Sequence, residues 1–277
     1  MNKKTISNAA LSVIIAAVSL AVISVVLRSL NLFFFFDSEL GYYERGAILP
    51  VVANLLLGLG SAFFVVFGFA FFRKKPIEYK KTNIATATVC VISALLCLVL
   101  TVSDAVSVIN GNRFGLLFAA LSFMSGLYFV CAATDLKPVY KIITGVFAII
   151  RLTLMLGGSY FDQQVQMNAP DKVLFGLACV FSMLLIASEL KVFVGTARSS
   201  VFTFSASIAS LLSAASSLPS IIAYHGGRLP ENNGLYAEYY LLLAIALYGV
   251  ARLVSTMITF IKENKNKTDS PESIDQI

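Results

Sequence analysis

Three arginines lie inside long apolar segments of the sequence, where charged side chains are rare. Arg151 follows Lys141 by ten residues and Arg252 precedes Lys262 by ten, whereas Arg28 lies nearer one end of its segment. At 1.5 Å per residue, Arg151 and Arg252 are each about 15 Å from the flanking lysine, near the middle of a bilayer. A planar guanidinium group suits a carboxylate or phosphate ligand. The arginines therefore predict an anion-binding site.

The alternative interpretation is that the arginines are structural and pair with polar groups of neighbouring helices. An arginine near the bilayer centre costs roughly 2.5–3.5 kcal/mol, so it should face the bundle interior beside a partner. Helix carbonyls, carboxylates or an amide such as that of Asn54 would serve. By position, however, Glu189 and Asp135 lie near one membrane edge and Asp104 and Glu238 near the other. We therefore expect no carboxylate at the depth of the two central arginines, which favours the binding interpretation.

The candidate substrate-binding residues are accordingly Arg28, Asn54, Arg151 and Arg252. A compact four-helix second half would bring the helices of Arg151 and Arg252 side by side, where the two charges repel unless an anion lies between them. We expect either one shared anionic site or two separate clusters of carbonyl groups, and we favour the shared site.

The sequence lacks the motifs of catalytic and metal-binding sites. His225 is the single histidine, and no Gly-x-Ser-x-Gly, HExxH or Walker motif occurs. The four cysteines lie in apolar segments and show no CxxC spacing, which is typical of small buried side chains rather than of metal ligands. We expect no enzyme activity, no cofactor and no metal site.

The composition explains why charged residues stand out. The chain is 58% hydrophobic and 13% charged, with a mean hydropathy of +0.83. Soluble domains have about 45–50% apolar and about 25% charged residues. The composition indicates an integral membrane protein and excludes a soluble enzyme, a nucleic-acid-binding module and a disulfide-framed secreted domain. The net charge of +6 is expected to come from basic loops, so no nucleic-acid partner is predicted.

Eight segments are long and apolar enough to cross a hydrocarbon core about 30 Å thick. They predict an all-α polytopic membrane protein with eight transmembrane helices, at residues 8–36, 48–72, 84–102, 114–134, 139–160, 173–194, 201–224 and 236–261.

The basic residues predict the orientation of these helices. Of 21 lysines and arginines, fourteen fall on the side of the two termini and three within the spans. The opposite side holds four, namely Arg45, Arg113, Lys172 and Arg228. Because cytoplasmic loops carry the excess of positive charge, we expect both termini in the cytoplasm and the protein in the plasma membrane of a prokaryote.

Two halves of the chain resemble each other. Arg28 and Arg151 each precede a segment that ends in Phe-Asp, and the sequence Gly-x-Arg ends at both Arg113 and Arg228. An even number of helices in each half would make this a parallel repeat. The alternative is coincidence, since Phe, Leu and Gly are abundant. The predicted units are residues 1–135, residues 136–261 and a disordered cytoplasmic tail at 262–277.

Small residues at four-residue spacing predict close helix contacts. The seventh segment carries such a series at Ser205, Ala209, Ser213 and Ser217. The second carries a shorter one at Asn54, Gly58 and Ala62, with Gly60 and Gly68 beside it. We expect the seventh helix at the centre of the bundle and the second as the next most central.

Taken together, these features favour a transporter, or a transport subunit, for a small anionic or amphiphilic solute. The alternative is a non-catalytic scaffold or accessory subunit that binds another membrane protein or lipid. The predicted partners are the lipid bilayer, a small anionic solute or lipid headgroup, and a membrane protein. A hydrated path to the arginines would distinguish the transporter from a scaffold that is packed throughout.

Overall fold

The computed structural model describes residues 3–37, 42–72, 77, 83–109, 111–134, 136–161, 169–229 and 236–269. Within these residues the chain forms eight α-helices, α1 (Lys3–Phe34), α2 (Ile48–Phe72), α3 (Ile84–Ile109), α4 (Gly115–Ala133), α5 (Pro138–Phe161), α6 (Pro170–Phe193), α7 (Ser199–His225) and α8 (Tyr239–Asp269). Two short antiparallel strands, β1 (Phe36–Asp37) and β2 (Tyr42–Tyr43), follow α1, and a 3-10 turn, η1 (Tyr236–Glu238), precedes α8.

All eight helices are long and apolar enough to cross a membrane, which confirms the predicted fold class. Helices α3 and α8 extend furthest beyond their predicted C-terminal ends. Helix α3 continues seven residues past Val102 to Ile109, through the polar residues Ser103 and Asp104 that lower the local hydropathy. Helix α8 continues to Asp269 into the segment expected to be disordered, because its lysine and glutamate residues are good helix formers.

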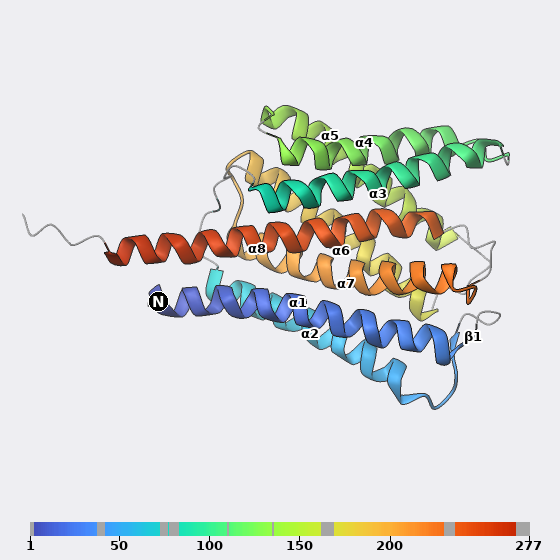
Figure 1. The fold of residues 1–277 in the computed structure, drawn as a ribbon, viewed down its shortest axis with the longest axis horizontal. Coiled ribbons are helices and arrows are strands. Elements are labelled where there is room, and N and C mark those ends of the chain that lie inside the picture. Colours follow the sequence, from blue (N-terminus) through green and yellow to red (C-terminus); the bar gives the residue numbers. More distant parts are fainter. Residues whose placement is uncertain are drawn as a thin grey trace, which may run out of the picture.

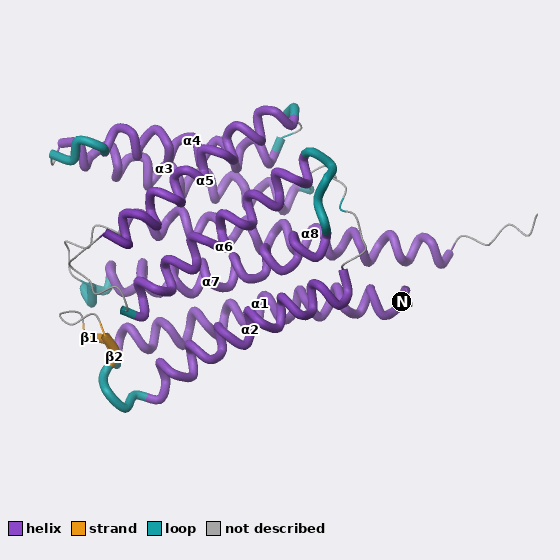
Figure 2. Tube along the Cα trace, turned by 180° about the vertical axis from the view of Figure 1, so that it is seen from behind, coloured by secondary structure: helices purple, strands orange, loops and turns teal. Residues whose placement is uncertain are grey.

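The helices run roughly parallel to one long axis, so the bundle has two ends (Figure 1). The end at which α1 begins and α8 ends is called the terminal face here. The opposite end, which carries β1 and β2, is called the hairpin face (Figure 2). Both ends of the described chain therefore lie on the same side, as an even number of spans requires.

Six helices form a closed ring. Each helix from α3 to α8 packs against the next one in the chain, and α8 packs back against α3. Helices α1 and α2 pair with each other outside this ring, where α1 lies against α7 and α8 and α2 lies against α7. This division into six plus two helices differs from the expected pair of four-helix halves, whose common ancestry remains a prediction.

Helix α7 is the most deeply buried span, as its small residues predict. Two serine pairs join it to α6, because the hydroxyl oxygens of Ser182 and Ser213 are 3.0 Å apart and those of Ser188 and Ser205 are also 3.0 Å apart. Such hydroxyl pairs satisfy polar groups between helices where water is absent.

The expectation that α2 is the next most central helix is wrong, because α2 lies outside the ring and is among the least buried spans. Gly60 and Gly68 are buried in contacts with the bundle, but Asn54, Gly58 and Ala62 lie on the exposed face. The glycines alone allow a close approach to α1 and α7, since a Cβ on Gly60 would lie 3.2 Å from Leu20. The spacing of small residues indicated a packing face on α2 but not which of two faces packs.

Candidate functional site

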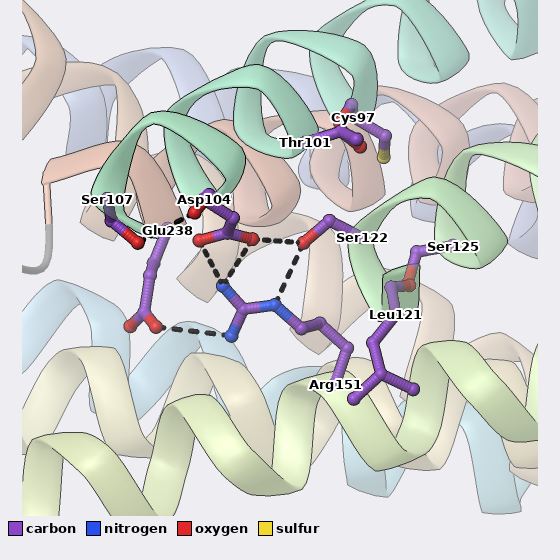
Figure 3. Close-up of polar contacts among 9 residues, drawn as sticks. All are labelled: Cys97, Thr101, Asp104, Ser107, Leu121, Ser122, Ser125, Arg151 and Glu238. Atoms are coloured by element: carbon purple, nitrogen blue, oxygen red, sulfur yellow. Dashed lines mark hydrogen bonds and ion pairs between the residues drawn. The ribbon is translucent and has the colours of Figure 1, made fainter. Parts of the chain in front are cut away.

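Each nitrogen of the Arg151 guanidinium group is hydrogen-bonded inside the ring (Figure 3). Its Nε donates to Ser122 Oγ at 3.0 Å, Nη1 donates to Glu238 Oε1 at 3.2 Å, and Nη2 donates to Asp104 Oδ2 at 3.3 Å. The Ser122 hydroxyl in turn donates to Asp104 Oδ2 at 2.6 Å. We call these four residues the Arg151 cluster. They come from α3, α4, α5 and η1 and lie toward the hairpin face.

A close contact between α3 and α4 positions this cluster. Gly115 begins α4, and a Cβ at this position would lie 2.8 Å from the carbonyl oxygen of Asp104. Only glycine therefore lets the first turn of α4 lie against α3 and brings Ser122 within reach of Asp104. The ring of Phe118 covers the guanidinium group of Arg151 at 5.2 Å, an arrangement in which an aromatic face attracts a cation.

The Arg151 cluster contains more carboxylates than cations. Asp104 and Glu238 flank a single arginine, and Glu238 Oε2 is buried with no hydrogen-bond partner among the described residues. A further anion at Arg151 would therefore meet two carboxylates and no free guanidinium nitrogen. The cluster is suited to joining three helices and η1, and it is not suited to an anionic ligand in this conformation.

Arg252 belongs to a second cluster near the terminal face. Its Nε donates to Glu189 Oε1 at 2.5 Å, and Tyr128 donates its hydroxyl hydrogen to Glu189 Oε2 at 2.8 Å. Glu189 is fully buried. The ring of Tyr248 packs edge-on against Tyr128 at 5.8 Å between centroids. This Arg252 cluster joins α4, α6 and α8, and both oxygens of its carboxylate are paired.

Arg28 forms the third pair, at the hairpin face. Its Nη2 donates to Asp171 Oδ1, and Tyr43 also donates its hydroxyl hydrogen to Asp171 Oδ1 at 3.0 Å. Burial raises the pKa of the Tyr43 phenol, and the nearby Asp171 carboxylate raises it further, so Tyr43 remains a donor. Asp171 lies in the first turn of α6, where the helix dipole favours a negative charge.

The structure pairs all three arginines with carboxylates. No carboxylate was expected at the depth of Arg151 and Arg252, but the long side chains of these arginines reach carboxylates that lie nearer the two faces. Arg151 and Arg252 also share no site. The partner of Arg151, Glu238, precedes Arg252 by fourteen residues along η1 and α8, which corresponds to roughly 20 Å. The two side chains reach toward opposite membrane faces, and carboxylates take the place of the carbonyl groups that were the alternative to a shared site.

Asn54 lies apart from these clusters. It is exposed on α2, and within the described part of the chain no hydrogen bond involves its amide. The sequence pattern predicts the arginines as site residues but not their partners, Asp104, Asp171, Glu189 and Glu238. The signal was available, because each of these carboxylates lies inside or at the end of an apolar segment, where an unpaired charge is costly.

We searched the described residues for side chains that could bind a metal ion. Among the described residues, no group of three or more His, Cys, Asp and Glu side chains could hold a metal ion. His225 ends α7 at the hairpin face, where its Nε2 contacts the hydroxyl groups of Tyr236 and Tyr240 at 2.5 and 3.3 Å. The imidazole of His225 thus belongs to an exposed cluster with two tyrosines.

No known protein family, no curated protein and no solved structure matches this chain.

Proposed function

We propose that this multi-pass membrane protein is a transporter, or a transport subunit, for a small anionic or amphiphilic solute. The supporting observation is that three buried arginines each pair with a carboxylate from a different helix, two near the hairpin face and one near the terminal face. Ion pairs at both ends of a bundle can open and close in turn as helices move, which alternating access to a central path requires.

Packing alone does not explain these charges. A buried ion pair is often no more stabilising than apolar side chains of the same volume, and the α6–α7 contact is made by serine pairs without any charge. Ionisable residues inside a membrane are therefore taken as functional by default. In this proposal the protein has no enzyme activity, and the ion pairs serve movement rather than chemistry.

The proposed location follows from the basic residues. The terminal face is assigned to the cytoplasm because most lysines and arginines lie on that side, and the hairpin face is assigned to the outside of the plasma membrane of a prokaryote. The Arg151 cluster then lies near the external surface and the Arg252 cluster near the cytoplasm.

A hydrated path is the property that a transporter needs and a packed scaffold lacks. We would place a single cysteine at Ser122 in a chain whose four buried native cysteines are replaced by alanine. A charged methanethiosulfonate reagent added to intact cells should modify Ser122→Cys. It should not modify the control Ala209→Cys, which is fully buried in α7. Lack of modification at both positions, in cells and in detergent, would contradict the transporter proposal.

One observation favours the alternative, a scaffold or accessory subunit that binds another membrane protein. Asn54 and Gly58 lie on the exposed face of α2, and a Cβ on Gly58 would meet no atom within 4 Å. An amide and small residues on one helix face are typical of contacts between transmembrane helices. Cross-linking from Gly58→Cys in cells should capture a second polypeptide if this alternative holds. The matched control is Leu59→Cys, at a neighbouring exposed position.

A further inference from the structure

Helix α1 carries a buried polar face at the boundary with the six-helix ring. Ser24, Arg28 and Asn31 are spaced four and three residues apart, so they lie on one side of the helix. Their exposed fractions are 1%, 2% and 0%. Arg28 reaches Asp171 at the start of α6, which shows that this face of α1 is directed toward the ring and not toward lipid.

Five polar atoms on this face have no hydrogen-bond partner among the described residues. They are Ser24 Oγ, Arg28 Nε, Arg28 Nη1, Asn31 Nδ2 and Asn31 Oδ1. More than nine in ten buried polar groups in proteins are paired. A buried polar group without a partner loses the hydrogen bonds that water would give it, and the hydrocarbon chains of lipid offer no replacement. Such a concentration of unpaired atoms on one helix indicates a ligand site.

The types of these atoms define the ligand. The two arginine nitrogens and the asparagine nitrogen can only donate, the serine hydroxyl can donate or accept, and only Asn31 Oδ1 is restricted to accepting. Donors therefore predominate. A ligand that matches them offers several oxygen acceptors within a few ångströms, as a carboxylate or a phosphate does. Charge-assisted hydrogen bonds from a guanidinium group to such oxygens are among the strongest in proteins.

The pairing with Asp171 does not use all the hydrogen-bond donors of Arg28. Asp171 uses only the Nη2 nitrogen of Arg28, and its charge is also stabilised by the Tyr43 hydroxyl and by the first turn of α6. Among the described residues, Nε and Nη1 of Arg28 therefore have no hydrogen-bond partner, and part of its positive charge is not offset by Asp171. This distinguishes it from Arg151, in which every guanidinium nitrogen is bonded.

We propose that Ser24, Arg28 and Asn31 bind the oxyanion group, a carboxylate or a phosphate, of a small molecule that enters between α1 and the ring. The inference deepens the proposed function, because it assigns the solute site to the boundary between α1 and the ring rather than to the ring interior. In the present conformation the site is closed around its polar atoms, so binding requires α1 to move relative to the ring.

The test uses the full chain purified in dodecyl maltoside. Its melting temperature is measured with inorganic phosphate, with hexanoate and with dioctanoyl phosphatidylglycerol. Chloride at equal ionic strength and dioctanoylglycerol are the controls that lack an oxyanion. At saturation, at least one oxyanion should raise the melting temperature by about 3 °C or more. A rise with phosphate or hexanoate indicates a free solute, and a rise with phosphatidylglycerol alone indicates a lipid headgroup.

Variants assign the effect to this site. Arg28→Met and Asn31→Leu should abolish the rise, and Arg113→Met, which removes an exposed arginine near the hairpin face, should retain it. If Arg28→Met does not fold, Asn31→Leu and Ser24→Ala are used to test whether the rise in melting temperature comes from this site. Both delete unpaired atoms, so without any oxyanion they should melt at the wild-type temperature or above it. A lower melting temperature of Asn31→Leu, or a rise that persists in both Arg28→Met and Asn31→Leu, would overturn the proposal, as would the absence of a rise with all three oxyanions.

The two proposals fail separately. Modification of Ser122→Cys without any oxyanion effect would leave the transporter proposal and remove the α1 site. An oxyanion effect that depends on Arg28, without modification of Ser122→Cys, would leave the α1 site and remove the proposed path through the ring.

Discussion

Arg252 on α8 and Glu189 on α6 form a salt bridge in which Nε lies 2.5 Å from Oε1, and both side chains are buried near the terminal face. Tyr128 on α4 completes the pair by donating to the second carboxylate oxygen. Three helices of the ring thus meet at one carboxylate. This pair offers the clearest measure of how much the buried charges depend on each other.

Removing one partner of this pair should cost far more than removing both. Arg252→Met or Glu189→Met leaves a buried charge without its partner and should lower the free energy of unfolding by about 3–5 kcal/mol. The double variant should recover most of that loss, because no unpaired charge remains. The stability of all three variants is compared by their melting temperatures in detergent. Additive losses in the double variant would mean that the two charges are not coupled.

Arg151 should depend on the shape of its side chain as well as on its charge. Arg151→Met leaves Asp104 and Glu238 without their cation and should be the most destabilising single change in the Arg151 cluster. Arg151→Lys keeps the charge but cannot reach Ser122, Glu238 and Asp104 at once, because an ammonium group lacks the planar fork. Its melting temperature should fall between wild type and Arg151→Met, and a melting temperature equal to that of wild type would contradict the geometry described.

The contact at Gly115 predicts a matched pair of glycine variants. Gly115→Ala places a Cβ within 2.8 Å of the Asp104 carbonyl oxygen and should cost about 1–3 kcal/mol, since α4 must shift away from α3. Gly157→Ala in α5 meets no atom within 4 Å and should be neutral or stabilising by about 0.5–1 kcal/mol. Thermal unfolding of both variants checks the prediction, which fails if Gly115→Ala is the more stable of the two.

Hydropathy was sufficient to predict the eight spans, because the solvent around each helix is lipid and the required length is fixed by the bilayer. Hydropathy placed the end of α3 too early, because Ser103 and Asp104 are polar residues of the kind found in loops. Asp104 is tolerated there because Arg151 pairs with it across the ring. A charge that is neutralised by a distant segment cannot be distinguished from a loop residue by local composition.

The ion pairs could not be predicted from the depth of each residue along its own helix. Arg151 lies near the middle of α5, yet its long side chain reaches Asp104 and Glu238 toward the hairpin face. Neighbouring helices also could not be assigned from chain order. The sequence halves suggested that α5 and α8 pack together, whereas the described helices place α5 between α4 and α6.

The orientation makes a direct labelling prediction. Arg113→Cys, exposed near the hairpin face, should react with a membrane-impermeant maleimide added to intact cells, and Lys137→Cys, exposed near the terminal face, should react only after the cells are opened. The positive-inside rule provides the reason. The reverse pattern of labelling would place the termini outside and would exchange the assignments of the Arg151 and Arg252 clusters.

Transport by this protein can be measured as solute uptake into proteoliposomes. Proteoliposomes containing the full chain are incubated with a defined mixture of small carboxylates and phosphate esters, and their contents are analysed by mass spectrometry. At least one compound should accumulate above the level in protein-free liposomes, Arg28→Met should abolish the accumulation, and Arg113→Met should preserve it. No accumulation of any compound by the wild-type protein would rule out transport of these solutes, and equal accumulation by Arg28→Met would rule out the site on α1.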